Sequence, residues 1–160
     1  MDYPLSSDHE IGASYHNYDA VSFILDSLAE LYSEICMVEN LGQTVKDRSM
    51  WSVLITDSID SEEAEPEVKY VANMHGDELL SQEMMLFFIQ YLLQNYESDY
   101  RIEKLVNTTE IRIVPNMNFD GSQQIERFNA DGYDLNRNFP DRDPGFENPD
   151  PLQPETQHII

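Results

Sequence analysis

Hydrophobic and polar residues in the first third of the chain follow the spacing of a helix and then of a β-hairpin. The apolar positions of residues 18–32 fall three or four apart, at Val21, Ile24, Leu25, Leu28 and Leu31. Residues with this spacing share one face of a helix, so the segment is predicted to be an amphipathic helix. Two short apolar runs follow at residues 36–41 and 50–56, with turn residues between them. This pattern is typical of two antiparallel strands.

The middle of the chain has the pattern strand, helix, strand. Residues 68–74 and 108–114 are apolar runs of strand length, and residues 78–95 are dense in Leu, Met and Phe over the length of a buried helix. A second helix is predicted within residues 97–106, and the acidic residues 57–67 are predicted to be an exposed connection. Strands joined through helices usually lie parallel in one sheet, so these segments predict an α/β fold.

The last segment predicts a loop and the start of another helix. Residues 140–154 are rich in Pro and Asp, and Pro154 suits the first turn of a helix because that position needs no N–H donor. The chain then stops at Ile159 and Ile160. Two exposed isoleucines seldom end a natural domain, so we expect the chain to be a fragment of a longer protein.

Composition narrows the classes of function. The 160 residues are 41% hydrophobic, enough for one domain with a core, but the net charge is −22. Nucleic acid and anionic membranes repel such a surface, so neither is expected as a partner. No segment is long enough to cross a membrane, and residues 1–14 lack the pattern of a secretion signal. The single cysteine, Cys36, excludes an internal disulfide and is expected to be a buried thiol.

His75 and Glu78 form a candidate metal-binding pair. They lie three residues apart where a strand is predicted to give way to a helix, a place from which both can point at one ion. A structural histidine is the other interpretation, and His16 with Asp19 has the same spacing in what is expected to be a surface position. The strand before His75 and the helix after it favour the metal ligand.

Arg127 and Arg137 form a second candidate group, in a chain with only nine Lys and Arg residues. A guanidinium beside an amide such as Asn136 suits a carboxylate, because parallel N–H donors match its two oxygens. Both arginines lie among aromatic residues, so they are predicted to be partly buried and to need a partner, whereas Arg142 is expected to pair with neighbouring surface acids. Both candidate groups follow a predicted strand, and open α/β sheets bind ligands beyond the carboxyl ends of their strands.

These motifs together resemble a known family. Asn-Met-His-Gly-Asp-Glu at 73–78, Asn-Phe-Asp-Gly at 118–121 and Asp-Leu-Asn-Arg-Asn-Phe-Pro-Asp at 134–141 are similar to motifs of the zinc metallocarboxypeptidases, most closely the carboxypeptidase E, N and D branch. The resemblance covers residues 15–160, with residues 1–14 as a tail. It implies the N-terminal half of a mixed-sheet α/β carboxypeptidase fold with helices on both faces, and a catalytic domain that is truncated at its C-terminal end.

The resemblance also implies a role for each site residue. His75 and Glu78 are expected to bind one zinc ion, and Asp134 to hold the imidazole of His75 through its other nitrogen. Arg127 is expected to stabilise the oxyanion formed from the scissile carbonyl. Asn136 and Arg137 are expected to bind the carboxylate of a peptide or protein C terminus.

The family's third zinc ligand, a histidine, and its general-base glutamate are expected beyond Ile160, since neither His9 nor His158 matches the third-ligand motif. The fragment alone is therefore expected to be inactive. Phe119 stands where the family more often has Pro, a change expected to be harmless.

Two other functions stay open at this stage. The same fold could serve a zinc deacylase or amidase acting on small or cell-wall peptides, or a non-catalytic module that binds carboxylates. The family resemblance implies a secreted or periplasmic protein, and the sequence leaves a cytoplasmic location open. It does not indicate an oligomeric state.

Overall fold

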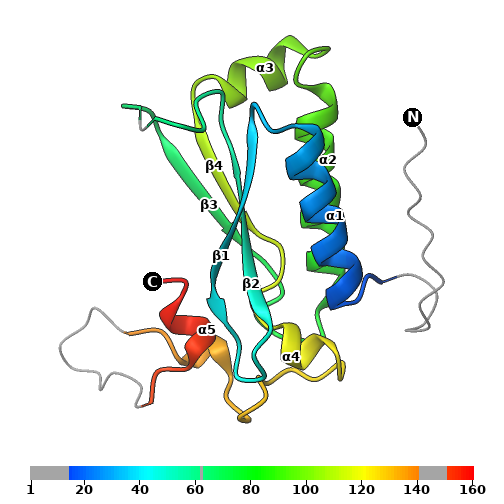
Figure 1. The fold of residues 1–160 in the computed structure, drawn as a ribbon. Helices are drawn as coiled ribbons and strands as arrows, with labels where there is room; N and C mark the ends of the chain where they lie inside the picture. Colours follow the sequence, from blue (N-terminus) through cyan, green and yellow to red (C-terminus); the bar gives the residue numbers. More distant parts are fainter. Residues whose placement is uncertain (1–14, 62, 141–150) are drawn as a thin grey trace.

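A computed structural model describes residues 15–61, 63–140 and 151–160 (Figure 1). Its elements, in chain order, are α1 (Tyr18–Leu31), β1 (Cys36–Gln43), β2 (Ser49–Ile55), β3 (Glu67–Val71), α2 (Leu79–Asn95), α3 (Tyr100–Val106), β4 (Glu110–Val114), α4 (Phe119–Ser122), the 3₁₀ turn η1 (Leu135–Arg137) and α5 (Pro154–Gln157).

The four strands form one mixed sheet in the order β1-β2-β4-β3. β1 and β2 are the predicted antiparallel hairpin, with Cys36 opposite Ile55, and β2 is antiparallel to β4. β3 and β4 are parallel, as the strand–helix–strand pattern predicted, and their last residues, Val71 and Val114, lie opposite each other. The α/β fold class is therefore confirmed.

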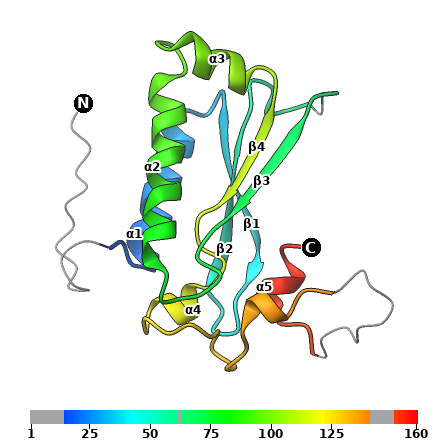
Figure 2. The same ribbon diagram turned by 180° about the vertical axis from the view of Figure 1, so that it is seen from behind.

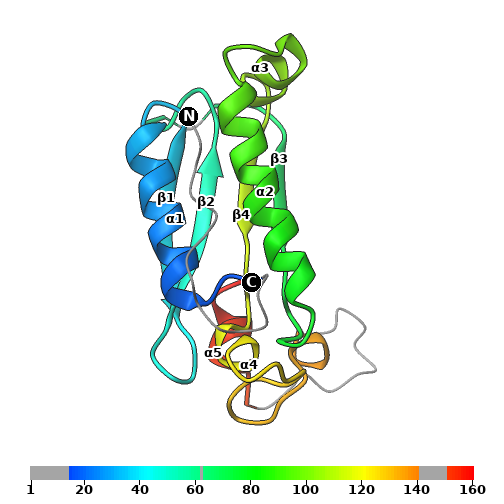
Figure 3. The same cartoon turned by 90° about the vertical axis from the view of Figure 1, so that its right-hand side faces the viewer.

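The main core lies between the sheet and the two long helices. α1 and α2 run side by side over one face of the sheet (Figures 1 and 3). Apolar side chains from the helices and from alternate strand positions fill the space between these two layers. The fully buried members include Val21, Leu28, Val53, Ile55, Ile89, Leu92, Ile113 and Phe119. Burial of this apolar surface is the main favourable contribution to folding.

A smaller apolar cluster lies on the opposite face of the sheet. Its buried members are Met50, Met117 and Leu135, and Ile159 just after α5 packs against them. α5 lies beside the end of β1 on this side of the sheet (Figure 2). His158 fills the space over Gly42, where an added Cβ would lie 2.2 Å from the imidazole Cε1. His158 therefore packs against the backbone of β1 at Gly42.

Several predicted boundaries were wrong by a few residues. The strand predicted at 68–74 ends at Val71, and Asn73 has a left-handed backbone with φ of 53°, which no strand can contain. The helix predicted within 97–106 is confirmed as α3, which begins at Tyr100 because the Asp99 carboxylate accepts the Arg101 N–H as an N-cap. The loop predicted at 140–154 lies mostly outside the described residues.

Cys36 is buried at the start of β1, as expected, and burial raises the pKa of its thiol to about 12. A thiol with this pKa is not a nucleophile at neutral pH. Within the described part of the chain, no helix combines the length and apolarity that crossing a membrane requires.

The core predicts a large difference between two phenylalanines. Phe119 is fully buried and makes an edge-to-face contact with Tyr18 at 5.0 Å, whereas Phe23 on α1 is 72% exposed. We expect Phe119→Ala to lower the free energy of unfolding by about 3–5 kcal/mol, because it leaves a cavity. Phe23→Ala should change it by less than about 0.5 kcal/mol. Urea unfolding of both variants tests this, and equal losses would contradict the proposed core.

Candidate functional site

The parallel pairing of β3 and β4 brings two loops together at one end of the sheet. The Ala72 N–H donates to the Val114 carbonyl at 2.9 Å, and the Met117 N–H donates to the Ala72 carbonyl at the same distance. Farther along both loops, the Gly76 N–H donates to the Arg127 carbonyl at 3.3 Å. The segments that carry His75 and Arg127 are therefore neighbours, as the predicted strand order required.

A short, tightly bonded loop presents His75 and Glu78 between β3 and α2. The Ser81 hydroxyl accepts the Asn73 N–H at 3.0 Å and donates to the Glu78 carbonyl at 2.8 Å. Ser81 thus joins the two ends of the loop. Asn73, with its positive φ, turns the chain out of the strand so that the intervening residues face away from the sheet.

The carboxylate of Asp134 joins the two candidate groups. Its Oδ1 lies 3.1 Å from Nε2 of His75, and its Oδ2 accepts from Nε and Nη2 of Arg127 at 3.1 and 3.0 Å. The same Oδ1 accepts the Asn136 N–H at 3.0 Å, which caps η1. One side chain therefore positions the imidazole, the guanidinium and the turn that carries Asn136 and Arg137.

These contacts also set the ionisation of Asp134. Burial opposes its charged form, but the hydrogen bonds from Arg127 and His75 outweigh burial and hold the pKa of this carboxyl below its usual value of 3.8. Asp134 is therefore an anion at neutral pH, able to accept a hydrogen bond from Nε2 of the imidazole. Because Asp134 bonds Nε2 of His75, the other ring nitrogen, Nδ1, is directed to Glu78.

The donor atoms of His75 and Glu78 fit a zinc ion. Nδ1 of His75 lies 3.2 Å from Oε1 of Glu78, so the two atoms converge on one point. The side chain of His75 is only 10% exposed while that of Glu78 is 59% exposed, so the pair opens to solvent on the carboxylate side. An imidazole and a carboxylate are two of the ligand types of catalytic zinc, which takes three protein ligands and an open position.

No third histidine joins this pair among residues 15–61, 63–140 and 151–160. His16 bonds Glu83 at 2.7 Å and its side chain is 16% exposed, so the prediction of a surface position is wrong for this residue, and His158 lies over Gly42. His9 lies outside the described residues. A cluster of three carboxylates, Asp57, Glu63 and Glu65, lies in the connection before β3, whereas His75 follows the end of β3. Burial and the neighbouring carboxylates of Asp57 and Glu63 raise the pKa of Glu65.

Asn136 and Arg137 lie on η1, directly after Asp134, and both are exposed. The prediction of partial burial is confirmed for Arg127 and is wrong for Arg137. Phe128 and Tyr133, two of the aromatic residues near the arginines in the sequence, are themselves 45% and 38% exposed. In the described part of the chain no ion pair involves Arg137, whose Nη1 donates to the Asn136 carbonyl at 3.1 Å. Arg142 lies outside the described residues.

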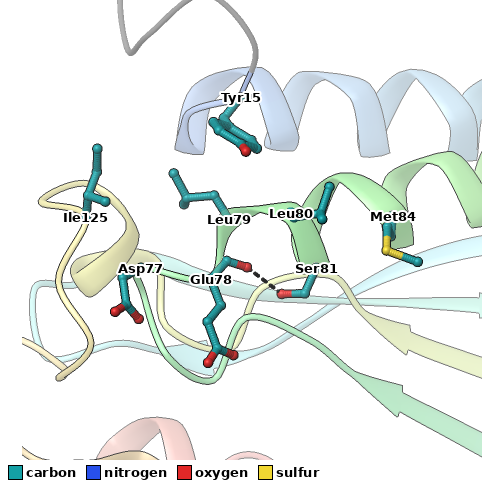
Figure 4. A pocket seen from close by; sticks show the side chains of 8 residues that line it. All are labelled: Tyr15, Asp77, Glu78, Leu79, Leu80, Ser81, Met84 and Ile125. Atoms are coloured by element: carbon teal, nitrogen blue, oxygen red, sulfur yellow. Dashed lines mark hydrogen bonds between the residues drawn. The ribbon is translucent and has the colours of Figure 1, made fainter.

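An apolar pocket of about 570 Å³ lies beside this loop but on its other side. Figure 4 shows Tyr15, Leu79 and Leu80 on one side of the α2 start, while the carboxylates of Asp77 and Glu78 point away from them. Asp77 and Glu78 are among the residues that line the pocket, so the pocket borders the metal pair.

Three residues that position the site had no role in the sequence prediction. Asn73, Ser81 and Asn118 hold the loops through hydrogen bonds of their backbone or side chains. A run of asparagines directly after a strand, as at positions 116 and 118, is the signal that could have identified the last of these, because Asn side chains readily bond nearby backbone groups.

Comparison with known proteins identifies the family of the chain. Residues 21–158 match the zinc carboxypeptidase family. The chain is 40% identical to carboxypeptidase M of Mus musculus over 91% of its own length and 35% of that protein. It is 38% identical to carboxypeptidase D of Anas platyrhynchos, over 91% of this chain and 11% of that protein. The chain thus spans about a third or less of these relatives.

Solved structures share the fold. Thrombin activatable fibrinolysis inhibitor superposes with a TM-score of 0.80 at 17% identity, over 91% of this chain and 43% of that chain. Carboxypeptidase A of Helicoverpa armigera gives 0.78 at 22% identity, over 91% and 41%. Family match, sequence identity and the mixed sheet with His75, Glu78, Arg127 and Asp134 together at one end all agree: the chain belongs to the zinc carboxypeptidase family.

Proposed function

We propose that this chain forms the part of a metallocarboxypeptidase active site that binds one zinc ion and the C-terminal carboxylate of a peptide. The complete enzyme would hydrolyse the last peptide bond of peptides or proteins. The observation that carries the proposal is the carboxylate of Asp134, which bonds His75 and Arg127 at once and precedes Asn136 and Arg137. Asp134 thus connects the proposed metal ligand, the proposed oxyanion stabiliser and the turn that carries the proposed carboxylate clamp.

His75 and Glu78 are proposed as two zinc ligands, through Nδ1 and the carboxylate. Asp134 holds the other imidazole nitrogen, which fixes the tautomer and the direction of the ring. Zinc bound there would supply a Lewis acid that activates water for attack on a peptide carbonyl. The third ligand and the general-base glutamate that the family resemblance implies stay predictions.

Arg127 is proposed to stabilise the negative charge that develops on the scissile carbonyl oxygen. Its Nε and Nη2 are engaged by Asp134, so the guanidinium is oriented before any substrate arrives. Asn136 and Arg137 are proposed to bind the free carboxylate of the substrate, since both are exposed and belong to one short turn. A location outside the cytoplasm, which the family resemblance implies, stays a prediction, as do the domain boundaries.

The carboxylate clamp predicts a preference for free C termini. We expect the chain to bind benzoyl-glycyl-arginine about tenfold more tightly than its C-terminal amide, because only the free acid accepts charge-assisted bonds from Arg137. Arg137→Ala should remove the difference. Arg101→Ala is the control, because Arg101 pairs with Asp99 at the far end of the molecule. Titrations followed by NMR measure both ligands. Equal binding of acid and amide by the wild-type chain would contradict the clamp and favour an amidase or deacylase.

The metal pair predicts that zinc binding depends on one histidine. We expect His75→Ala to weaken Zn²⁺ binding at least about tenfold, because it removes a ligand. His16→Ala, which removes a histidine bonded to Glu83, should leave it unchanged. Competition with a chromophoric chelator measures the affinities. If His75→Ala and the wild type bind Zn²⁺ equally, His75 is not a ligand.

The lowered pKa of Asp134 predicts a pH-dependent contribution to stability. A carboxyl whose pKa falls on folding stabilises the protein above its usual value of 3.8, and this contribution is lost as the pH falls through the folded-state pKa. Asp134→Asn should therefore lower the free energy of unfolding at pH 7 and approach the wild type in acid. Urea unfolding at several pH values from 7 downward tests this. A difference independent of pH would show that Asp134 contributes through packing rather than charge.

A further inference from the structure

One buried asparagine contacts both segments of the candidate site. Asn118 is fully buried after β4, and its Nδ2 donates to the carbonyl of Met74 at 3.3 Å and to the carbonyl of Arg127 at 3.4 Å. Met74 directly precedes the proposed zinc ligand His75. A single amide group thus joins the segment that carries the imidazole to the segment that carries the guanidinium.

The other atoms of Asn118 hold this amide in place. Its Oδ1 accepts the Gly121 N–H at 2.9 Å as the N-cap of α4, and its own N–H donates to Oδ1 of Asn116 at 2.8 Å. Nδ2 of Asn116 donates in turn to Oε1 of Gln82 on α2 at 2.7 Å. Because each of these groups is buried and bonded, the side chain of Asn118 has little freedom to rotate.

The His75 segment also approaches residues 121–126 closely at Gly76. An added Cβ on Gly76 would lie 2.3 Å from the carbonyl carbon of Gly121 and 2.4 Å from the carbonyl oxygen of Glu126. The Gly76 N–H uses this approach to donate to the Arg127 carbonyl. The carbonyl of Arg127 therefore receives two donors, one from Gly76 and one from Asn118.

We propose that Asn118 is a positioning residue, whose carboxamide fixes the distance between the His75 segment and the Arg127 segment so that both side chains reach Asp134. Asn118 bonds the backbone beside the imidazole and the guanidinium rather than these groups themselves, and it would touch no substrate. The benefit of this positioning for catalysis rests on the proposed function. The claim that Asn118 fixes the distance between the two segments concerns the metal-free chain.

The alternative is that Asn118 only caps α4, and one substitution separates the two roles. Asn118→Ser keeps a side-chain oxygen suited to an N-cap and removes the carboxamide donor. The matched control is Asn17→Ser, because Asn17 caps α1 by accepting the Ala20 N–H at 2.9 Å, whereas the Met74 and Arg127 carbonyls are bonded by Asn118.

Amide hydrogen exchange of the metal-free 160-residue chain, followed by NMR, tests the inference. In Asn118→Ser we expect the Gly76 amide to exchange about tenfold faster, beyond any change shared by the core amides of β2, because the segments can then separate. Asn17→Ser should leave Gly76 unchanged relative to those amides. Unchanged exchange of Gly76 in Asn118→Ser would overturn the inference and leave Asn118 as a cap only.

A wild-type measurement decides the matter if Asn118→Ser does not fold. The side-chain amide protons of Asn118 should exchange far more slowly than those of the exposed Asn107, and equal rates would overturn the inference. Zinc titration adds a second readout: Asn118→Ser should weaken binding about tenfold. A wild-type chain that binds no zinc contradicts the proposed function, while the exchange comparison still decides the role of Asn118.

Discussion

The structure depends on the parallel pairing of β3 with β4. Because Val71 and Val114 lie opposite each other, both strands stop at the same level and both following loops leave from the same end of the sheet. Backbone bonds continue the pairing for a few residues beyond the strands, from Ala72 and Met117. The proposed chemistry depends on both strands ending at the same level, because a shift of either strand along the other would carry His75 away from Arg127.

Asp134 converts this proximity into a defined site. The chain has 31 acidic residues and only nine Lys and Arg residues, so most cations have an anion nearby. Arg127 nevertheless makes a defined pair, because two of its nitrogens bond the same oxygen of Asp134. The carboxylate has two oxygens, and each takes a different partner: one faces His75 and the other faces Arg127. The hydrogen bonds from Arg127 and His75 that lower the pKa of Asp134 thus also orient these two side chains, on which catalysis would depend.

Much of the fold could be predicted from periodicity. The helix predicted at 18–32 is α1, the two apolar runs are β1 and β2, and the buried helix predicted at 78–95 is α2 within one residue. Strand ends were less predictable, because the positive φ of Asn73 is imposed by bonds to Ser81 and Ser122, which lie elsewhere in the chain. The exposure of Arg137 was missed for a similar reason, since aromatic neighbours in sequence do not have to cover it in space.

The sequence by itself determined the order of the elements and the family, because helix and strand periods and the motifs around His75 and Asp134 are local properties of the chain. Only the tertiary structure decided that one carboxylate serves both His75 and Arg127, and that Asn118 bonds the carbonyls beside them. Such contacts join residues that lie far apart in the chain, and no local pattern encodes a distance across a fold.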